Sequence, residues 1–174
     1  MAVQERFTPE EWQEVVAGPV DAGLFIAFVH PQGPFGLAHE MKAIFDATVP
    51  GVINAPSELI REVGAVLAKK KGEGGEADQM KASADRAKAH SKSDPQAFFL
   101  EEITRAMALV SQKAPEDAPT YKAWLVECAE KTAQAAKEGG FLGMGGEHVT
   151  ARETAAIDRL KSAIDTTDSA VPAS

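Results

Sequence analysis

Two pairs of neighbouring histidine and glutamate residues are the first candidates for chemistry in this chain of 174 residues. His39-Glu40 and Glu147-His148 each lie at the end of a segment with the same order of glycine and apolar residues. Imidazole and carboxylate groups are common ligands of Zn²⁺, Mn²⁺ and Fe²⁺. Neighbours on a helix point about 100° apart, so each pair would supply one ligand. If the two segments converge, the pairs form a divalent-metal site; otherwise they are polar residues near helix starts, and we expect no cofactor.

A glycine-rich loop is the second candidate. Residues 139–146 read Gly-Gly-Phe-Leu-Gly-Met-Gly-Gly and precede an expected helix start. Backbone N–H groups at a helix N-terminus attract anions, but the chain lacks the strand and the Gly-Lys-Ser/Thr sequence of the known nucleotide loops. The simpler interpretation is a left-handed glycine that ends one helix, followed by apolar residues that fill the core. An anion or small-metabolite site remains the remote alternative, with the residues Gly140, Gly143, Gly145, Gly146 and Thr150.

No set of residues forms a recognisable catalytic motif. The single cysteine, Cys128, shares a helical face with Trp124 and Leu125, so we expect a buried thiol. The carboxylate pair Glu101-Glu102 is expected in the first turn of a helix or on a solvated face. No motif connects a histidine to a nucleophile; the four histidines are His30, His39, His90 and His148. The sequence therefore favours a non-enzymatic protein, and we assign no catalytic residue.

Charge and cysteine content restrict the environment and the partners. The net charge is -8, from 18 Lys and Arg against 26 Asp and Glu, which argues against a nucleic-acid-binding protein. One cysteine excludes an internal disulfide and is typical of a reducing compartment. The longest uncharged stretch, residues 22–39, is interrupted by prolines and glycines, so we expect no membrane span. These features predict an acidic, cytoplasmic protein.

Composition and apolar spacing predict helices throughout. The chain has 31 alanines, whereas Leu, Ile, Val and Phe together number 37. Alanine is the strongest helix former, and the apolar residues recur with helical spacing and do not alternate. We expect an all-α, single-domain bundle of about seven to eight helices over residues 1–165. Thr8-Pro9 starts the first helix, and Gly18-Pro19 should break it into helices at about 9–17 and 19–30.

Two segments differ from the rest of the chain. Residues 72–92 contain Met80 as their only bulky apolar side chain, which predicts a flexible connector followed by a weakly packed or solvated helix. Residues 166–174 read as a disordered tail. The similar glycine segments that end in Glu40 and Glu147 also raise an arrangement of two pseudo-symmetric helical hairpins.

Residues 146–153, Gly-Glu-His-Val-Thr-Ala-Arg-Glu, followed by Ile157 and Leu160, resemble the helical-hairpin turn of TerB-like (tellurite-resistance-associated) proteins. The resemblance implies an all-α bundle with a role in stress response, in which some members bind divalent metal through acidic residues. Gly145 stands where the metal-ligating aspartate of that family would be, and one extra residue precedes the helix cap.

The two ends of the chain carry a second, broader resemblance. Glu11-Trp12 and residues 137–143 are similar to uncharacterised small bacterial all-helical proteins. Our leading hypothesis is a non-enzymatic protein that acts through protein–protein contact or self-association, most simply as a homo-oligomer. The alternative is a TerB-like metal-binding stress module. The leading hypothesis rests on the low content of large apolar residues and on bulky residues in terminal or loop regions, namely Trp12, Phe35, Phe141 and Met144.

Overall fold

The computed structural model describes residues 2–29, 44, 55–90, 94–138 and 150–169. These ranges contain a 3-10 turn and six α-helices and no strand: η1 (Val3–Arg6), α1 (Pro9–Ala27), α3 (Glu58–Leu67), α4 (Glu76–His90), α5 (Pro95–Lys113), α6 (Ala118–Glu138) and α7 (Ala151–Ser169). The all-α prediction is confirmed. The prediction of seven to eight helices and of pseudo-symmetric hairpins is not confirmed, and the glycine segments on which the symmetry rests lie outside the described residues.

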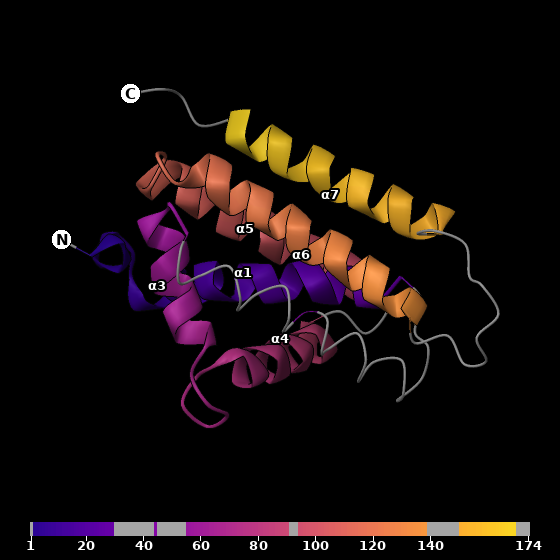
Figure 1. Cartoon of the computed structure of the whole chain (residues 1–174), viewed down its shortest axis with the longest axis horizontal. Coiled ribbons are helices and arrows are strands. Elements are labelled where there is room, and N and C mark those ends of the chain that lie inside the picture. Colours follow the sequence, from indigo (N-terminus) through magenta and orange to yellow (C-terminus); the bar gives the residue numbers. More distant parts are fainter. Residues whose placement is uncertain (1, 30–43, 45–54, 91–93, 139–149, 170–174) are drawn as a thin grey trace.

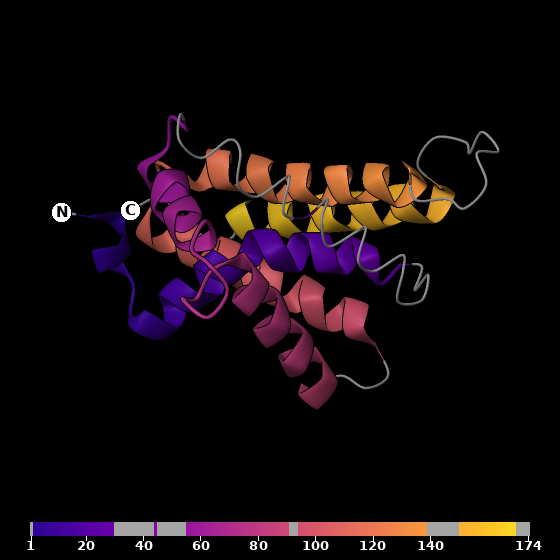
Figure 2. The same ribbon diagram turned by 60° about the horizontal axis from the view of Figure 1, so that its bottom comes forward.

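Helix α1 is the centre of the bundle. It packs against α4, α5 and α6, while α7 lies against α5 and α6 (Figure 1). Helix α3 crosses one end of the bundle next to η1. Figure 2 shows α4 diverging from the direction shared by α1, α6 and α7.

The core forms where the apolar stripes of the helices meet. From Val15 to Ala27 every residue of α1 is buried. Trp12 is only 3% exposed and contacts the Phe7 ring, with 5.9 Å between the ring centroids. The prediction of a buried Cys128 is confirmed, and burial raises the pKa of its thiol well above the ordinary value. The thiol therefore stays protonated and unreactive at neutral pH.

The predicted break at Gly18-Pro19 is wrong, because α1 continues through it. Proline has no N–H, so the carbonyl of Val15, four residues earlier, loses its helical partner. The hydroxyl of Tyr121 in α6 donates a hydrogen bond to this carbonyl at 2.7 Å. Gly18 makes room for the hydroxyl, since a Cβ atom there would overlap it. A long-range contact therefore keeps a proline-containing helix whole.

Polar side chains cap the starts of several helices, and α1 begins at Thr8-Pro9 as predicted. Thr8 and Glu11 form a reciprocal capping box at α1. Ser57 accepts a hydrogen bond at the start of α3, and Asp94 accepts one from Ala97 at the start of α5. These side chains satisfy N–H groups that have no partner within the helix.

Helix α4 buries an unusually polar face. Its buried residues are Glu76, Gln79, Met80, Ser83 and Ala87. The glycine-rich turn before α4 is held by Asp78, whose carboxylate accepts hydrogen bonds from the backbone N–H groups of Gly72 and Gly74. Both glycines have positive φ angles, which other residues rarely adopt. The contacts of α4 with α1 and α5 therefore depend on polar groups.

The last helix extends into the segment that was predicted to be a disordered tail. Helix α7 ends at Ser169, so its final turn covers part of residues 166–174. The Thr166 hydroxyl donates a hydrogen bond to the Ser162 carbonyl at 2.9 Å, which is one way a threonine is accommodated in a helix.

Candidate functional site

Of the residues predicted to bind a metal or an anion, Thr150 alone is described. It caps α7: its N–H and hydroxyl both donate to the Glu153 carboxylate, and its Oγ1 accepts from the Glu153 N–H at 3.2 Å. Outside the described residues lie His39, Glu40, Gly140, Gly143, Gly145, Gly146, Glu147 and His148. The metal site and the anion loop therefore stay predictions.

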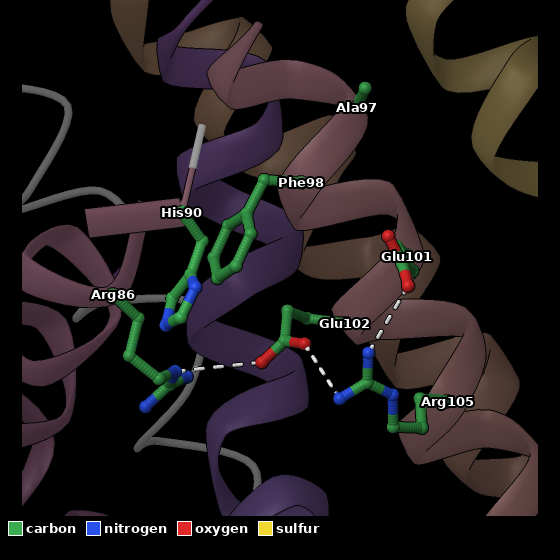
Figure 3. A pocket seen from close by; sticks show the side chains of 7 residues that line it. All are labelled: Arg86, His90, Ala97, Phe98, Glu101, Glu102 and Arg105. Atoms are coloured by element: carbon green, nitrogen blue, oxygen red, sulfur yellow. Dashed lines mark hydrogen bonds and ion pairs between the residues drawn. The ribbon is translucent and has the colours of Figure 1, made fainter. Parts of the chain in front are cut away.

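The structure contains a pocket that these predictions did not include. A cavity of about 430 Å³ lies between the end of α4 and the first half of α5. Figure 3 shows two arginines and two glutamates along one side and the rings of His90 and Phe98 above them. The lining residues are Arg86, His90, Ala97, Phe98, Glu101, Glu102 and Arg105. The volume falls in the range of small-molecule sites.

An alternating row of charges lines the pocket. Arg105 contacts Glu101 at 3.3 Å through Nη2 and Glu102 at 3.1 Å through Nη1 (Figure 3). The other oxygen of Glu102 lies 3.5 Å from Nε of Arg86. The Glu102 side chain is 12% exposed, whereas that of Glu101 is 73% exposed. Glu102 thus joins the two arginines. Neither glutamate lies in the first turn of α5, and of the two only Glu101 lies on a solvated face.

Arg86 also reaches behind the pocket into the core. Its Nη2 atom lies 3.6 Å from Oδ2 of Asp21 in α1 and donates a hydrogen bond to the Ser83 hydroxyl at 3.1 Å. The Asp21 side chain is 2% exposed. One guanidinium group therefore connects the pocket with a buried carboxyl group in the central helix.

Burial changes the acidity of Asp21. Loss of water raises its pKa from 3.8 to about 7, while a hydrogen bond from Ser83 and the charge of Arg86 partly offset this, and the charge of Glu102 adds to it. Desolvation dominates because a buried carboxylate loses its hydration. Asp21 also raises the pKa of Tyr121, although burial of the phenol is the larger cause. Asp21 therefore gains or loses its proton near neutral pH.

Some polar atoms of this cluster lack a hydrogen-bond partner within the part of the chain that the structure describes. They include Nε of Arg86 and Oδ1 of Asp21. A buried donor without a partner is costly, so such an atom commonly marks the position of a ligand or water. Arg86 has five N–H donors, and the Ser83 oxygen takes only one of them. Among the described residues, Arg86 therefore has more N–H donors than hydrogen-bond acceptors.

Aromatic rings complete the pocket. The His90 and Phe98 rings lie nearly parallel, with 5° between their planes and 6.3 Å between their centroids (Figure 3). Phe98 is half-buried, and its ring also meets Phe99 of the core edge to face. The pocket thus offers a flat apolar wall next to a charged side, the combination that orients small organic ligands.

Metal chemistry finds no support in the described ranges. They contain no group of three or more His, Cys, Asp or Glu side chains placed to hold one ion.

A second cavity, of about 460 Å³, lies at the N-terminus, where Phe7 and Trp12 are among the lining residues. It includes no cluster of opposite charges, so the α4–α5 pocket has the richer chemistry.

The sequence did not indicate this site, because two helices line the pocket and Asp21 behind it belongs to a third. One signal was available: Asp21 is the only charged residue between Val15 and Val29, a run of apolar and small residues. A lone carboxyl group in such a run predicts a buried, functional or paired acid. Arg86 and Arg105 have no comparable signal, because each lies among other charged and polar residues.

Comparison of the chain with protein-family models, curated proteins and solved structures gave no match. The resemblances to TerB-like proteins and to small bacterial helical proteins therefore stay predictions. Within the described ranges, no helix has both the length and the apolar character that crossing a membrane requires.

Proposed function

We propose that this protein is a non-enzymatic binding protein whose ligand site is the pocket between α4 and α5. One observation carries the proposal: two arginines, two glutamates and two aromatic rings from two helices line a single cavity of about 430 Å³. Charged donors and acceptors beside an apolar wall favour recognition of a small organic molecule with a charged group.

The pocket contains no nucleophile paired with a base. His90 stacks on Phe98, and the carboxylates of Glu101 and Glu102 are occupied by Arg105. Ligand binding needs only these donors, acceptors and rings, whereas catalysis would need a reactive group held next to its activator. This arrangement supports binding as the function.

The experiment is a nuclear magnetic resonance titration of the ¹⁵N-labelled full chain with a panel of small acids, amines and neutral aromatic molecules. We expect at least one class to shift the amide signals of α4 and α5 near Arg86, His90 and Phe98. Arg86→Lys should weaken this binding, because lysine lacks the planar set of donors. Arg159→Lys, at an exposed position of α7, is the matched control and should leave binding unchanged. A panel that shifts no signals of the pocket contradicts the proposal.

Self-association is our second proposal. The bulky residues that first suggested it give less support now, because Trp12 is buried in the core and Phe35, Phe141 and Met144 lie outside the described residues. The half-buried apolar side chains Leu100, Leu109 and Val126 still favour it, since an oligomer would cover them. Light scattering after size exclusion, at high micromolar concentration, should give a mass above 18.4 kDa; a strict monomer rules it out.

A further inference from the structure

We propose that the α4–α5 pocket binds a small organic monocarboxylate with a flat apolar group, whose carboxylate replaces Asp21 as the partner of Arg86 while Asp21 takes up one proton from solvent. This inference rests on the proposed function and specifies its ligand and its pH dependence. It is carried by the position of Arg86, which lines the pocket on one side and lies 3.6 Å from Asp21 on the other.

The carboxylate follows from the unused donors of Arg86. Its ion pairs with Asp21 and Glu102 are long, at 3.6 and 3.5 Å, and 38% of its side chain is exposed. Guanidinium and carboxylate groups match each other through two parallel hydrogen bonds. Arg105 is less suited, because its contacts with Glu101 and Glu102 are shorter, at 3.3 and 3.1 Å. Arg86 is therefore the group that receives the ligand.

The charge balance restricts the ligand to a single negative charge. The two arginines of the pocket are matched by Glu101 and Glu102, and Glu102 lies beside Arg86. A dianion would meet these carboxylates at close range, where like charges repel. The parallel rings of His90 and Phe98 favour a flat apolar group in the remaining space. Benzoate has both features and serves as the probe.

Proton uptake follows from what surrounds Asp21. The groups that face it are Arg86 and Ser83 of α4, Glu102 of α5 and Tyr121 of α6. Arg86 is the only cation among them. When a ligand carboxylate pairs with Arg86, the Asp21 carboxylate loses that compensation and remains buried next to Glu102. An O–H bond then forms on Asp21 as the acid form of the buffer gives up its proton, and the conjugate base of the buffer stays in solution.

Asp21 is expected to titrate within the pH range in which binding can be measured. Burial has already raised the Asp21 pKa to about 7, so the free protein is mostly ionised at this position at pH 8. Binding must then include protonation, and the affinity falls as the pH rises further. We expect benzoate to bind roughly tenfold more weakly at pH 8.5 than at pH 7.

Isothermal titration calorimetry of the full chain with benzoate tests the proposal. Titrations at pH 8 in HEPES and in Tris, whose ionisation enthalpies differ, should show uptake of close to one proton per ligand. Asp21→Asn should still bind benzoate but without proton uptake and with an affinity that no longer changes with pH. His90→Gln should keep the proton uptake, since the proton goes to Asp21.

Matched ligands and variants separate the outcomes. Benzyl alcohol and benzylamine lack the carboxylate, acetate lacks the ring, and each should bind at least about tenfold more weakly than benzoate. Arg86→Lys should weaken benzoate binding by a similar factor while retaining the charge next to Asp21, and Arg159→Lys should not.

Three results would overturn the inference. Benzoate binding without proton uptake, or with uptake that persists in Asp21→Asn, contradicts the role of Asp21. Pocket binding of benzylamine or benzyl alcohol in preference to benzoate contradicts the ligand class and leaves the proposed function standing. Failure of every member of the wider panel to bind at the pocket contradicts the proposed function itself.

Discussion

At the scale of single residues, Asp21 is the most unusual feature of the molecule. It is a carboxyl group with 2% exposure in the middle of the central helix, and the nearest cation, on Arg86, lies 3.6 Å away. Desolvation therefore outweighs the favourable contacts and raises its pKa to about 7. The ionised form of this carboxyl group therefore lowers the stability of the native state at and above neutral pH.

This cost predicts how stability depends on pH. The unfolded chain releases the Asp21 proton near pH 3.8, whereas the native protein holds it to about pH 7. The native state therefore binds more protons in this interval, and the contribution of Asp21 to the free energy of unfolding falls as the pH rises from about 4 to 7. The full loss is about 4 kcal/mol, because one pKa unit corresponds to about 1.4 kcal/mol.

Asp21→Asn removes this titration. Chemical denaturation of the unmodified protein and of the variant between pH 4 and pH 8 measures the effect on the free energy of unfolding. As the pH rises, the free energy of unfolding of the variant should increase relative to that of the unmodified protein. This difference should level off above about pH 7. Glu101→Gln, at an exposed position of the same cluster, is the control and should show little such change. A difference that is constant across the range would mean that Asp21 does not titrate there.

At the scale of helices, the continuity of α1 through Pro19 could not be predicted from local sequence. Gly18-Pro19 is a normal signal for a break, and the contact that overrides it comes from Tyr121, more than a hundred residues later. The capping boxes at Thr8 and Thr150 were predictable, because each involves residues only three positions apart. Local patterns thus determine where helices begin, and distant contacts decide whether they continue.

The Tyr121 hydroxyl should therefore stabilise α1 through the Val15 carbonyl. Tyr121→Phe leaves this buried acceptor without a partner and should lower the free energy of unfolding by about 1–3 kcal/mol. In the background of Pro19→Ala the same change should cost less, because the new N–H can bond the Val15 carbonyl. Thermal and urea unfolding of the four proteins of this double-mutant cycle measure the coupling. Equal costs in both backgrounds would show that the hydroxyl acts elsewhere.

At the scale of the whole molecule, the sequence predicted the class of fold but not the site. Periodic stripes such as those that include Leu59, Phe99 and Leu125 indicate helices with one buried face, and these residues do lie in the core. The pocket requires Asp21, Arg86 and Glu102 to come together from α1, α4 and α5. Their spacing along the chain carries no signal of this, because the packing of three helices creates the juxtaposition.

The same packing places α4 both in the core and at the pocket. It contacts α1 and α5 through a buried face that includes Gln79 and Ser83, and it contributes Arg86 and His90 to the pocket. Polar contacts depend more on charge and hydrogen bonding than apolar contacts do. A ligand that pairs with Arg86 would therefore act on the central helix of the bundle through α4.

The central claim is that ligand binding at the pocket changes the protonation of Asp21. One measurement tests this coupling directly. Nuclear magnetic resonance of the side-chain carboxyl carbon, assigned by comparison with Asp21→Asn, follows the protonation of Asp21 as the pH is varied. In the free protein the signal should titrate near pH 7, and saturating benzoate should move its midpoint to a higher pH. A midpoint near 4, or one near 7 that benzoate binding at the pocket leaves in place, would contradict the account.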